Sequence, residues 1–193
     1  MPSLLLDARA ELGESPRWSV AEQCLYWTDI AAQRIHRFDP ASGENRTRQM
    51  AEPVGCLAPR AGGGLILGMR GGAAVIDHWD AEPRPFGPQF LADAPDYRCN
   101  DACTDAAGRW WLASVDEAKR AHDAALYRID PDGGVERMFG GMTTGNSAAF
   151  SPDGRTFYHA DTPTHAIRAF DFDPDSGALG EPRLFHQFPH GTG

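Results

Sequence analysis

The chain has 193 residues, of which 41% are hydrophobic and 23% charged, a composition too apolar for a disordered protein. Its 18 basic and 27 acidic residues give a net charge of -9, which argues against binding to nucleic acid or to an anionic membrane surface. No stretch approaches the roughly 18 consecutive apolar residues of a membrane span. The first residues also lack the basic start and apolar core of a signal peptide. We therefore expect a cytoplasmic globular protein without nucleic-acid or membrane partners.

Short apolar or aromatic segments recur along the chain, about 40 to 46 residues apart, which is the interval typical of propeller blades. Partner segments follow in which apolar and polar residues alternate, each ending at a turn that contains glycine. The recurring segments are 24–27, 65–67, 110–112 and 156–158, and the partners are 34–39, a degenerate copy at 73–79, 125–130 and 166–171. Residues 117–125 allow one turn of helix. The pattern predicts an all-β chain of four-stranded units that stack as the blades of a β-propeller.

Three motifs lie between these repeats. Residues 11–18 read ELGESPRW, residues 98–101 read RCND, and residues 145–155 read GNSAAFSPDGR. In this order, and at blade spacing, they resemble the gluconolactonase/regucalcin (senescence-marker-protein) family of sugar lactonases over nearly the whole chain. Ser147 departs from the glycine that is usual in the third motif. The resemblance implies a six-bladed β-propeller, of which about four blades lie in this chain.

The resemblance also implies a metal site at the mouth of the central channel. It implies Glu14 and Asn146 as ligands of one divalent ion, and Arg98 and Asn100 as substrate contacts. A further acidic residue of the family falls at Asp116 or Glu117, and the register between these two stays open.

The main acidic residue of the family would lie beyond Gly193, because the chain ends where the family commonly continues into Pro-Asp-Gly. We therefore expect residues 1–193 to be a single propeller domain that is incomplete at its C-terminus.

These residue types suit metal-assisted opening of an ester ring. Carboxylate and amide oxygens favour calcium, with zinc, magnesium, manganese or iron as alternatives. Such an ion polarises a carbonyl and activates water, while a donor such as Arg98 can stabilise the oxyanion. A carboxylate must accept the proton that the attacking water loses. The first candidate is the acidic residue expected beyond Gly193, and the next are Asp116 and Glu117. We predict hydrolysis of a gluconolactone-, xylonolactone- or arabinolactone-type sugar lactone to the aldonic acid.

A second class of function remains open, namely a non-catalytic propeller used for metal-dependent regulation or for binding a protein or ligand. Residues 26–29 spell the YWTD of receptor-type propellers, but only once, whereas those proteins repeat it in every blade.

Other chemistries are disfavoured. The seven histidines show no HxH or HExxH spacing for zinc, and no GxSxG supports a serine esterase. The four cysteines match no zinc spacing, so we expect plain thiols.

Overall fold

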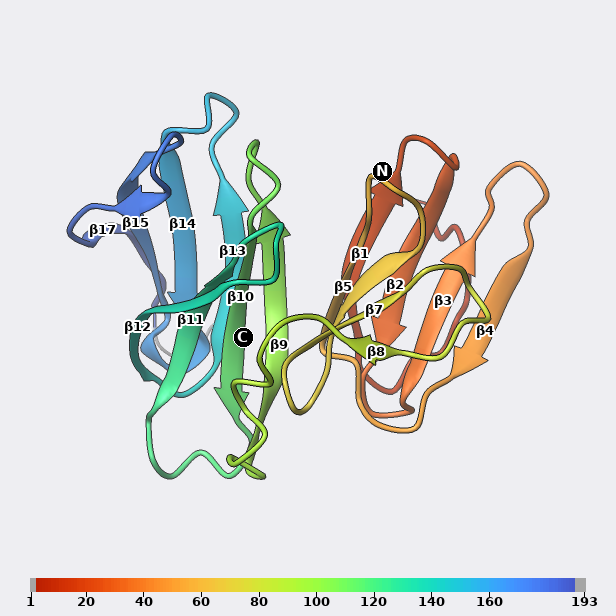
Figure 1. Cartoon of the computed structure of the whole chain (residues 1–193), viewed down its shortest axis with the longest axis horizontal. Coiled ribbons are helices and arrows are strands. Elements are labelled where there is room, and N and C mark those ends of the chain that lie inside the picture. The colour runs from red at the N-terminus through yellow and green to blue at the C-terminus, as the bar shows by residue number, and fades with distance from the viewer. Residues whose placement is uncertain (1–2, 190–193) are drawn as a thin grey trace.

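The computed structural model describes residues 3–189, which form four antiparallel sheets in chain order (Figure 1). The first sheet contains β1 (Gly13–Ser19), β2 (Cys24–Asp29), β3 (Arg34–Phe38) and β4 (Asn45–Gln49). The second contains β5 (Cys56–Pro59), β6 (Leu65–Gly68), β7 (Ala73–Ile76) and β8 (Arg84–Pro85). The third contains β9 (Tyr97–Thr104), β10 (Trp110–Asp116), β11 (Ala124–Ile129) and β12 (Val135–Met142). The fourth contains β13 (Gly145–Phe150), β14 (Thr156–Asp161), β15 (Ala166–Asp173), β16 (Ala178–Leu179) and β17 (Arg183–Gln187).

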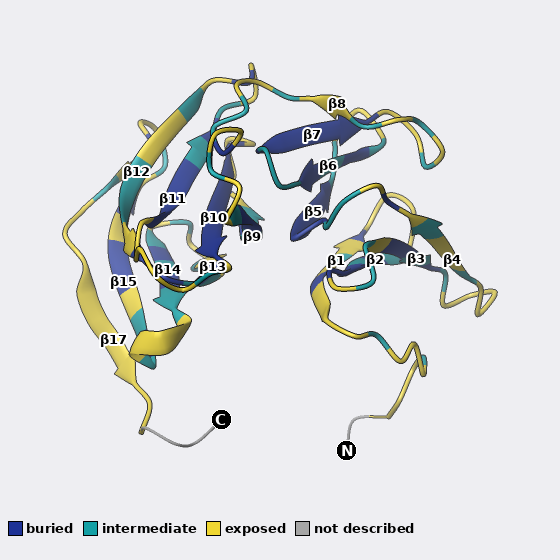
Figure 2. Ribbon diagram, turned by 90° about the horizontal axis from the view of Figure 1, so that it is seen from below, coloured by how far each residue is buried: buried dark blue, intermediate teal, exposed yellow. Residues whose placement is uncertain are grey.

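The four sheets fan around a common opening as the blades of a β-propeller, which confirms the predicted fold. Figure 2 shows β1, β5, β9 and β13 nearest this opening, with β4, β8, β12 and β17 toward the rim. Almost every pairing joins strands that follow each other in the chain; β17, which pairs with β15, is the exception. The degenerate second copy still forms a blade, because all four residues of β7 are buried. We number the sheets blade 1 to blade 4 in chain order.

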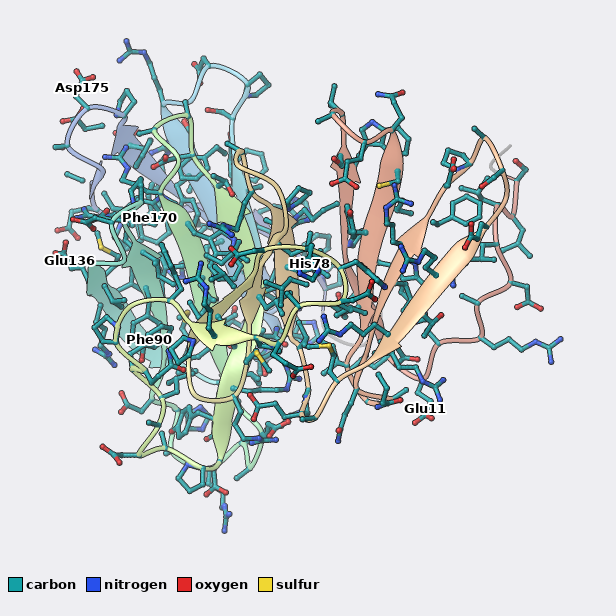
Figure 3. The ribbon with its side chains drawn as sticks, turned by 45° about the vertical axis from the view of Figure 1, so that its right-hand side comes forward. Glu11, His78, Phe90, Glu136, Phe170 and Asp175 are labelled. Atoms are coloured by element: carbon teal, nitrogen blue, oxygen red, sulfur yellow. The ribbon has the colours of Figure 1, made fainter. Side chains whose placement is uncertain are left out.

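Aromatic and aliphatic side chains fill the spaces between neighbouring blades. Between blades 2 and 3, the rings of Phe90 and Tyr127 lie 4.3 Å apart, centroid to centroid. Between blades 3 and 4, Phe139 stacks on Phe170 at 5.1 Å, and Trp111 is fully buried. Figure 3 shows Phe90 and Phe170 among these packed side chains, whereas Glu136 and Asp175 lie at the outer edge. Burying such rings contributes about 2 kcal/mol or more each, so the junctions hold the blades at fixed angles.

A few local expectations can be checked directly. Residues 117–123 form a short turn followed by an irregular loop and not a helix, and residues 124 and 125 already belong to β11. The described residues contain one helical element, the 3-10 turn Thr162–Thr164. Across residues 3–189, no helix is long and apolar enough to cross a membrane. All four cysteines are free, as predicted, and only Cys103 is partly exposed. Residues 190–193, on which the expectation about the chain end depends, lie outside the described part.

Candidate functional site

Three of the four innermost strands carry a β-bulge. The pairing of β1 with β2 shifts between Glu14 and Arg17, and that of β13 with β14 shifts between Asn146 and Ala149. In β9, Asn100 has no residue opposite it, because its neighbours on either side pair with consecutive residues of β10. A bulge turns a side chain out of the regular alternation of a strand. The sequence places these residues just before or between the recurring strand pairs; the structure shows them within the innermost strands, where the bulges redirect them.

One pocket is lined by five of the six residues that the sequence singled out. Glu14 comes from blade 1, Arg98, Asn100 and Glu117 from blade 3, and Asn146 from blade 4. The other lining residues are Leu12, Ile30, Val115, Lys119, Thr144 and Thr162. The propeller thus brings Glu14 and Asn146, which are 132 positions apart, to one pocket, since the inner strands of three blades converge there.

In blade 1, the backbone turns at Ser15 so that Glu14 can face the pocket. Ser15 adopts a left-handed conformation, with φ 52°, and is 4% exposed. Its Oγ accepts the N–H of Leu57 at 3.1 Å, which anchors the bulge to β5 of the next blade. Partial burial raises the pKa of Glu14, the Asp101 carboxylate raises it further, and Arg98 opposes both. Among the described residues, no arginine or lysine forms an ion pair with Glu14.

In blade 3, a buried arginine organises two polar side chains. Arg98 is 8% exposed. Its Nε lies 3.0 Å from Oε1 of Glu117, and its Nη1 donates to Oδ1 of Asn100 at 2.8 Å. The other oxygen of Glu117 lies 2.8 Å from Nη1 of Arg70, which comes from the loop between β6 and β7 of blade 2. Asn100 in turn donates to the carbonyl of Gly145 at 2.9 Å. Glu117 is therefore neutralised twice, and Asn100 is fixed between blades 3 and 4.

Asp116 has a different environment from its neighbour Glu117. It is 1% exposed, and its Oδ2 accepts the backbone N–H groups of Arg120 and Ala121, both at 2.8 Å. The Ala121 amide, helped by that of Arg120, lowers the pKa of Asp116 against the opposing effect of burial. Its carboxylate holds the turn after β10 and does not line the pocket. Of the two residues between which the sequence left the register open, Glu117 lines the pocket and Asp116 does not.

In blade 4, Asn146 is held by its own neighbours. Its Oδ1 accepts the N–H of Ser147 at 3.0 Å, and its Nδ2 donates to Oγ1 of Thr162 at 3.4 Å. Ser147 has φ 56°, a left-handed conformation that glycine adopts most easily. Ser147 stands where the resembled motif has glycine, and it keeps the left-handed backbone that glycine would adopt there.

Arg17 and Asp101 link the blades next to the pocket. Arg17 of β1 donates to the carbonyl of Ala102, and its Nη2 lies 3.4 Å from Oδ1 of Asp101. Oδ2 of Asp101 accepts the N–H of Ala148 in β13 at 3.0 Å. Because these bonds join blades 1, 3 and 4, they fix the strands that carry Glu14, Asn100 and Asn146 relative to one another.

The donor set fits an oxygen-liganded cation. Glu14 supplies a carboxylate that no cationic side chain of residues 3–189 neutralises, and Asn146 supplies an amide carbonyl in the same pocket. Hard divalent ions prefer such oxygens and complete their coordination with water or substrate. The described part of the chain contains no group of three or more His, Cys, Asp or Glu that could bind a metal by itself.

The sequence did not single out two cationic residues of this region, Arg70 and Lys119. Arg70 contacts Glu117 from another blade, a contact that only the assembled propeller reveals. Lys119 lies two residues after Glu117, and a polar loop gives no sign of which side chains face a pocket.

Comparisons with known proteins identify the family of the chain. The SMP-30/Gluconolactonase/LRE-like region matches residues 12–193. A 6-deoxy-6-sulfogluconolactonase of Pseudomonas putida is 37% identical over 187 residues, covering 94% of this chain and 62% of that protein.

Two solved structures show the same fold. A calcium-binding regucalcin of Agrobacterium tumefaciens has a TM-score of 0.91 at 23% identity, covering 98% of this chain and 64% of that one. A gluconolactonase of Xanthomonas campestris has a TM-score of 0.77 at 26% identity, covering 94% and 64%.

The chain thus spans slightly less than two thirds of the length of these relatives. Its four blades correspond to four of the six in the relatives' propeller. With the family match extending over almost all residues, the chain belongs to the SMP-30/gluconolactonase/regucalcin family.

Proposed function

We propose that this site hydrolyses the ring ester of a sugar-acid lactone to the open aldonic acid with the help of a bound divalent metal ion. The observation that carries the proposal is the convergence of Glu14, Arg98, Asn100 and Asn146 from three blades on one pocket. Two of the relatives above are named as lactonases, which supports the same chemistry. Gluconolactone-, xylonolactone- and arabinolactone-type rings are the substrates we would test first.

Glu14 and Asn146 would hold the metal, which when bound supplies Lewis acidity and lowers the pKa of a water ligand. Calcium is our first choice, because both ligands are hard oxygens; zinc, magnesium, manganese and iron are alternatives.

The remaining residues orient the ring and stabilise charge. Asn100 is fixed by Arg98 and by the Gly145 carbonyl, so its amide presents a pre-oriented polar group to a sugar hydroxyl. Nη2 of Arg98 bonds to no described residue, so it is free to stabilise negative charge developing on the lactone carbonyl oxygen. Burial of this arginine strengthens that interaction, because water screens it less.

Neither acidic candidate is placed well to accept the proton of the attacking water. Glu117 is paired with Arg98 and Arg70, and Asp116 faces backbone amides. We assign Glu117 to orienting the substrate hydroxyls and Asp116 to holding the turn that follows β10. The proton would go to a group other than these two.

The test measures the base needed to hold the pH constant while gluconolactone opens to its acid, with and without a chelator. We expect the chelator to abolish opening and added calcium to restore it. Glu14→Gln should lower kcat/KM by about 100-fold or more, because it removes the carboxylate ligand. The matched control is Glu11→Gln, an exposed carboxylate of the same segment that lies outside the pocket (Figure 3). Opening that resists the chelator, or an equal loss in both variants, would contradict the proposal.

The alternative is a metal-binding propeller that regulates or binds without hydrolysis. It is favoured by the engagement of both acidic candidates in other contacts, because Glu117 pairs with Arg70 and Asp116 accepts backbone N–H groups. Calcium binding measured by calorimetry, together with no opening of any lactone in the panel, would establish this alternative.

A further inference from the structure

The positive charges around the pocket are not equally neutralised. Arg98 and Arg70 both pair with Glu117, at 3.0 and 2.8 Å. Arg120 pairs with Asp96 at 3.7 Å. Lys119 lines the pocket, yet no carboxylate within the described ranges pairs with its ammonium group. The pocket therefore presents a cationic group, the Lys119 ammonium, that no carboxylate of residues 3–189 neutralises.

The backbone of Lys119 is held in a fixed position. Its N–H donates to the carbonyl of Asp116 at 3.0 Å, and its φ of 52° places it in the left-handed region. The buried Asp116 carboxylate binds the next two amides, those of Arg120 and Ala121. This turn is thus anchored to the end of β10, so the lysine stem begins at a defined point beside Glu117.

Resting on the function proposed above, we propose that the lactone carries a second acidic oxyanion, a sulfonate or a phosphate, on the carbon remote from the ring ester. Lys119 binds this group. The ring ester would lie at Glu14 and Asn146, and Asn100, Glu117 and Lys119 line the same pocket. The hydroxyls of a neutral sugar already find partners in Asn100 and Glu117, whereas an ammonium matches a tetrahedral oxyanion.

The overall charge of the protein makes this local cation important. A net charge of -9 repels an anionic substrate at long range. A compact, unpaired ammonium at the pocket offsets this repulsion within about one Debye length, roughly 8 to 10 Å at physiological salt. We therefore expect binding of the charged lactone to depend on this side chain, whereas binding of a neutral lactone does not.

The experiment compares three lactones that differ at one carbon: gluconolactone, 6-phosphogluconolactone and 6-deoxy-6-sulfogluconolactone. Lys119→Gln should lower kcat/KM for the charged substrates by about tenfold or more, mainly through KM, because a charge-assisted contact is lost. The value for gluconolactone should change by less than about twofold. Lys119→Arg should keep most of the preference. The two charged substrates separate a sulfonate site from a phosphate site.

Arg120→Gln is the matched control. It removes the same charge from the adjacent residue, but Arg120 is paired with Asp96 and does not line the pocket. An equal loss in both variants would overturn the inference, since it would indicate a general field effect. So would equal turnover of charged and neutral lactones by the unmodified protein.

Calorimetric binding of the three opened acids separates this inference from the proposed function. If no lactone is opened but the charged acids still bind in a Lys119-dependent way, lactone hydrolysis fails and the Lys119 site stands. If lactones are opened and Lys119→Gln binds all three acids as the unmodified protein does, hydrolysis stands and the Lys119 site fails.

Discussion

Blades 1 and 4 share the same structure at the edge that faces the pocket. In blade 1, Gly13 pairs with Asp29 at the start of β1, and Glu14 and then a left-handed Ser15 follow. In blade 4, the corresponding residues are Gly145, which pairs with Asp161, then Asn146, and Ser147 with φ 56°. The backbone that presents the two side chains is repeated, and the presented group differs: a carboxylate in one blade and an amide in the other.

Asp29 ends β2 and Asp161 ends β14, and the two carboxylates have the same structural role. Asp29 accepts the N–H groups of Glu11 and Leu12, both at 3.0 Å, and Asp161 accepts those of Thr143 and Thr144 at 3.2 and 2.7 Å. Each carboxylate thus fixes the segment that leads into the bulged strand. The comparison teaches that the fold supplies a repeated frame, while the chemistry depends on single side chains held by it.

The largest expected effect comes from exchanging the two presented groups. The double variant Glu14→Asn with Asn146→Glu keeps the net charge and both bulges, but moves the carboxylate from blade 1 to blade 4. We expect kcat/KM for the lactone to fall by about 100-fold or more, because the carboxylate no longer has its original position relative to Arg98. Thermal unfolding serves as the control for folding. Activity close to that of the unmodified protein would show that the two positions are equivalent.

A smaller effect is expected from Asp29→Asn, and it should depend on pH. Burial disfavours the charged form, but the amides of Leu12, Glu11 and Ala32 outweigh it and lower the pKa of Asp29. A lowered pKa in the folded state means that the stabilisation is present above the unfolded value, about 4, and is lost as pH falls through the folded value.

The variant should therefore lose about 2 kcal/mol of unfolding free energy at pH 7 and less at pH 3, which lies below the unfolded value. Urea unfolding at the two pH values measures this difference. A loss of the same size at both would show that the charge of Asp29 contributes nothing to the contact.

The smallest effect should separate the two serines. Ser15 is buried and bonded to Leu57, whereas Ser147 is exposed. Ser15→Ala leaves the Leu57 N–H without its partner, so we expect a loss of about 1 kcal/mol. Ser147→Ala should change the free energy of unfolding by less than about 0.5 kcal/mol. Both substitutions keep the left-handed backbone, so the strain cancels in the comparison, and equal losses would contradict the role given to the Leu57 contact.

The sequence predicts the middle strands of the blades well and the innermost strands poorly. Residues 24–27 form a short apolar and aromatic run, and in residues 34–39 apolar and polar side chains alternate because one face of the strand is buried. Strand β1 contains Pro16 and a bulge, and β13 consists mostly of small residues, so neither shows this period. Strand β4 reads NRTRQ and contains no apolar residue, so only its pairing with β3 identifies it.

The candidate site follows from motif similarity more than from residue chemistry. Glu14 and Asn146, taken alone, look like an exposed carboxylate and a turn residue. The choice between Asp116 and Glu117 depends on where β10 ends, and all seven of its residues are buried, so no alternation marks that end. The Arg70 contact depends on how blades 2 and 3 stack, which no local pattern encodes.

The link between Arg17 and Asp101 has a consequence for how the chain is made. The two residues are 84 positions apart, while nearly all strand pairing in the molecule is between neighbours in sequence. At a synthesis rate of about 5–20 residues per second, blade 1 would emerge from the ribosome roughly 4–17 seconds before its partner in blade 3. During that interval the hairpins of blade 1 can form, but the carboxylate of Glu14 is not yet held against the residues of β9. The pocket is therefore completed only after blade 4 has been made, even though the blades themselves can form one after another.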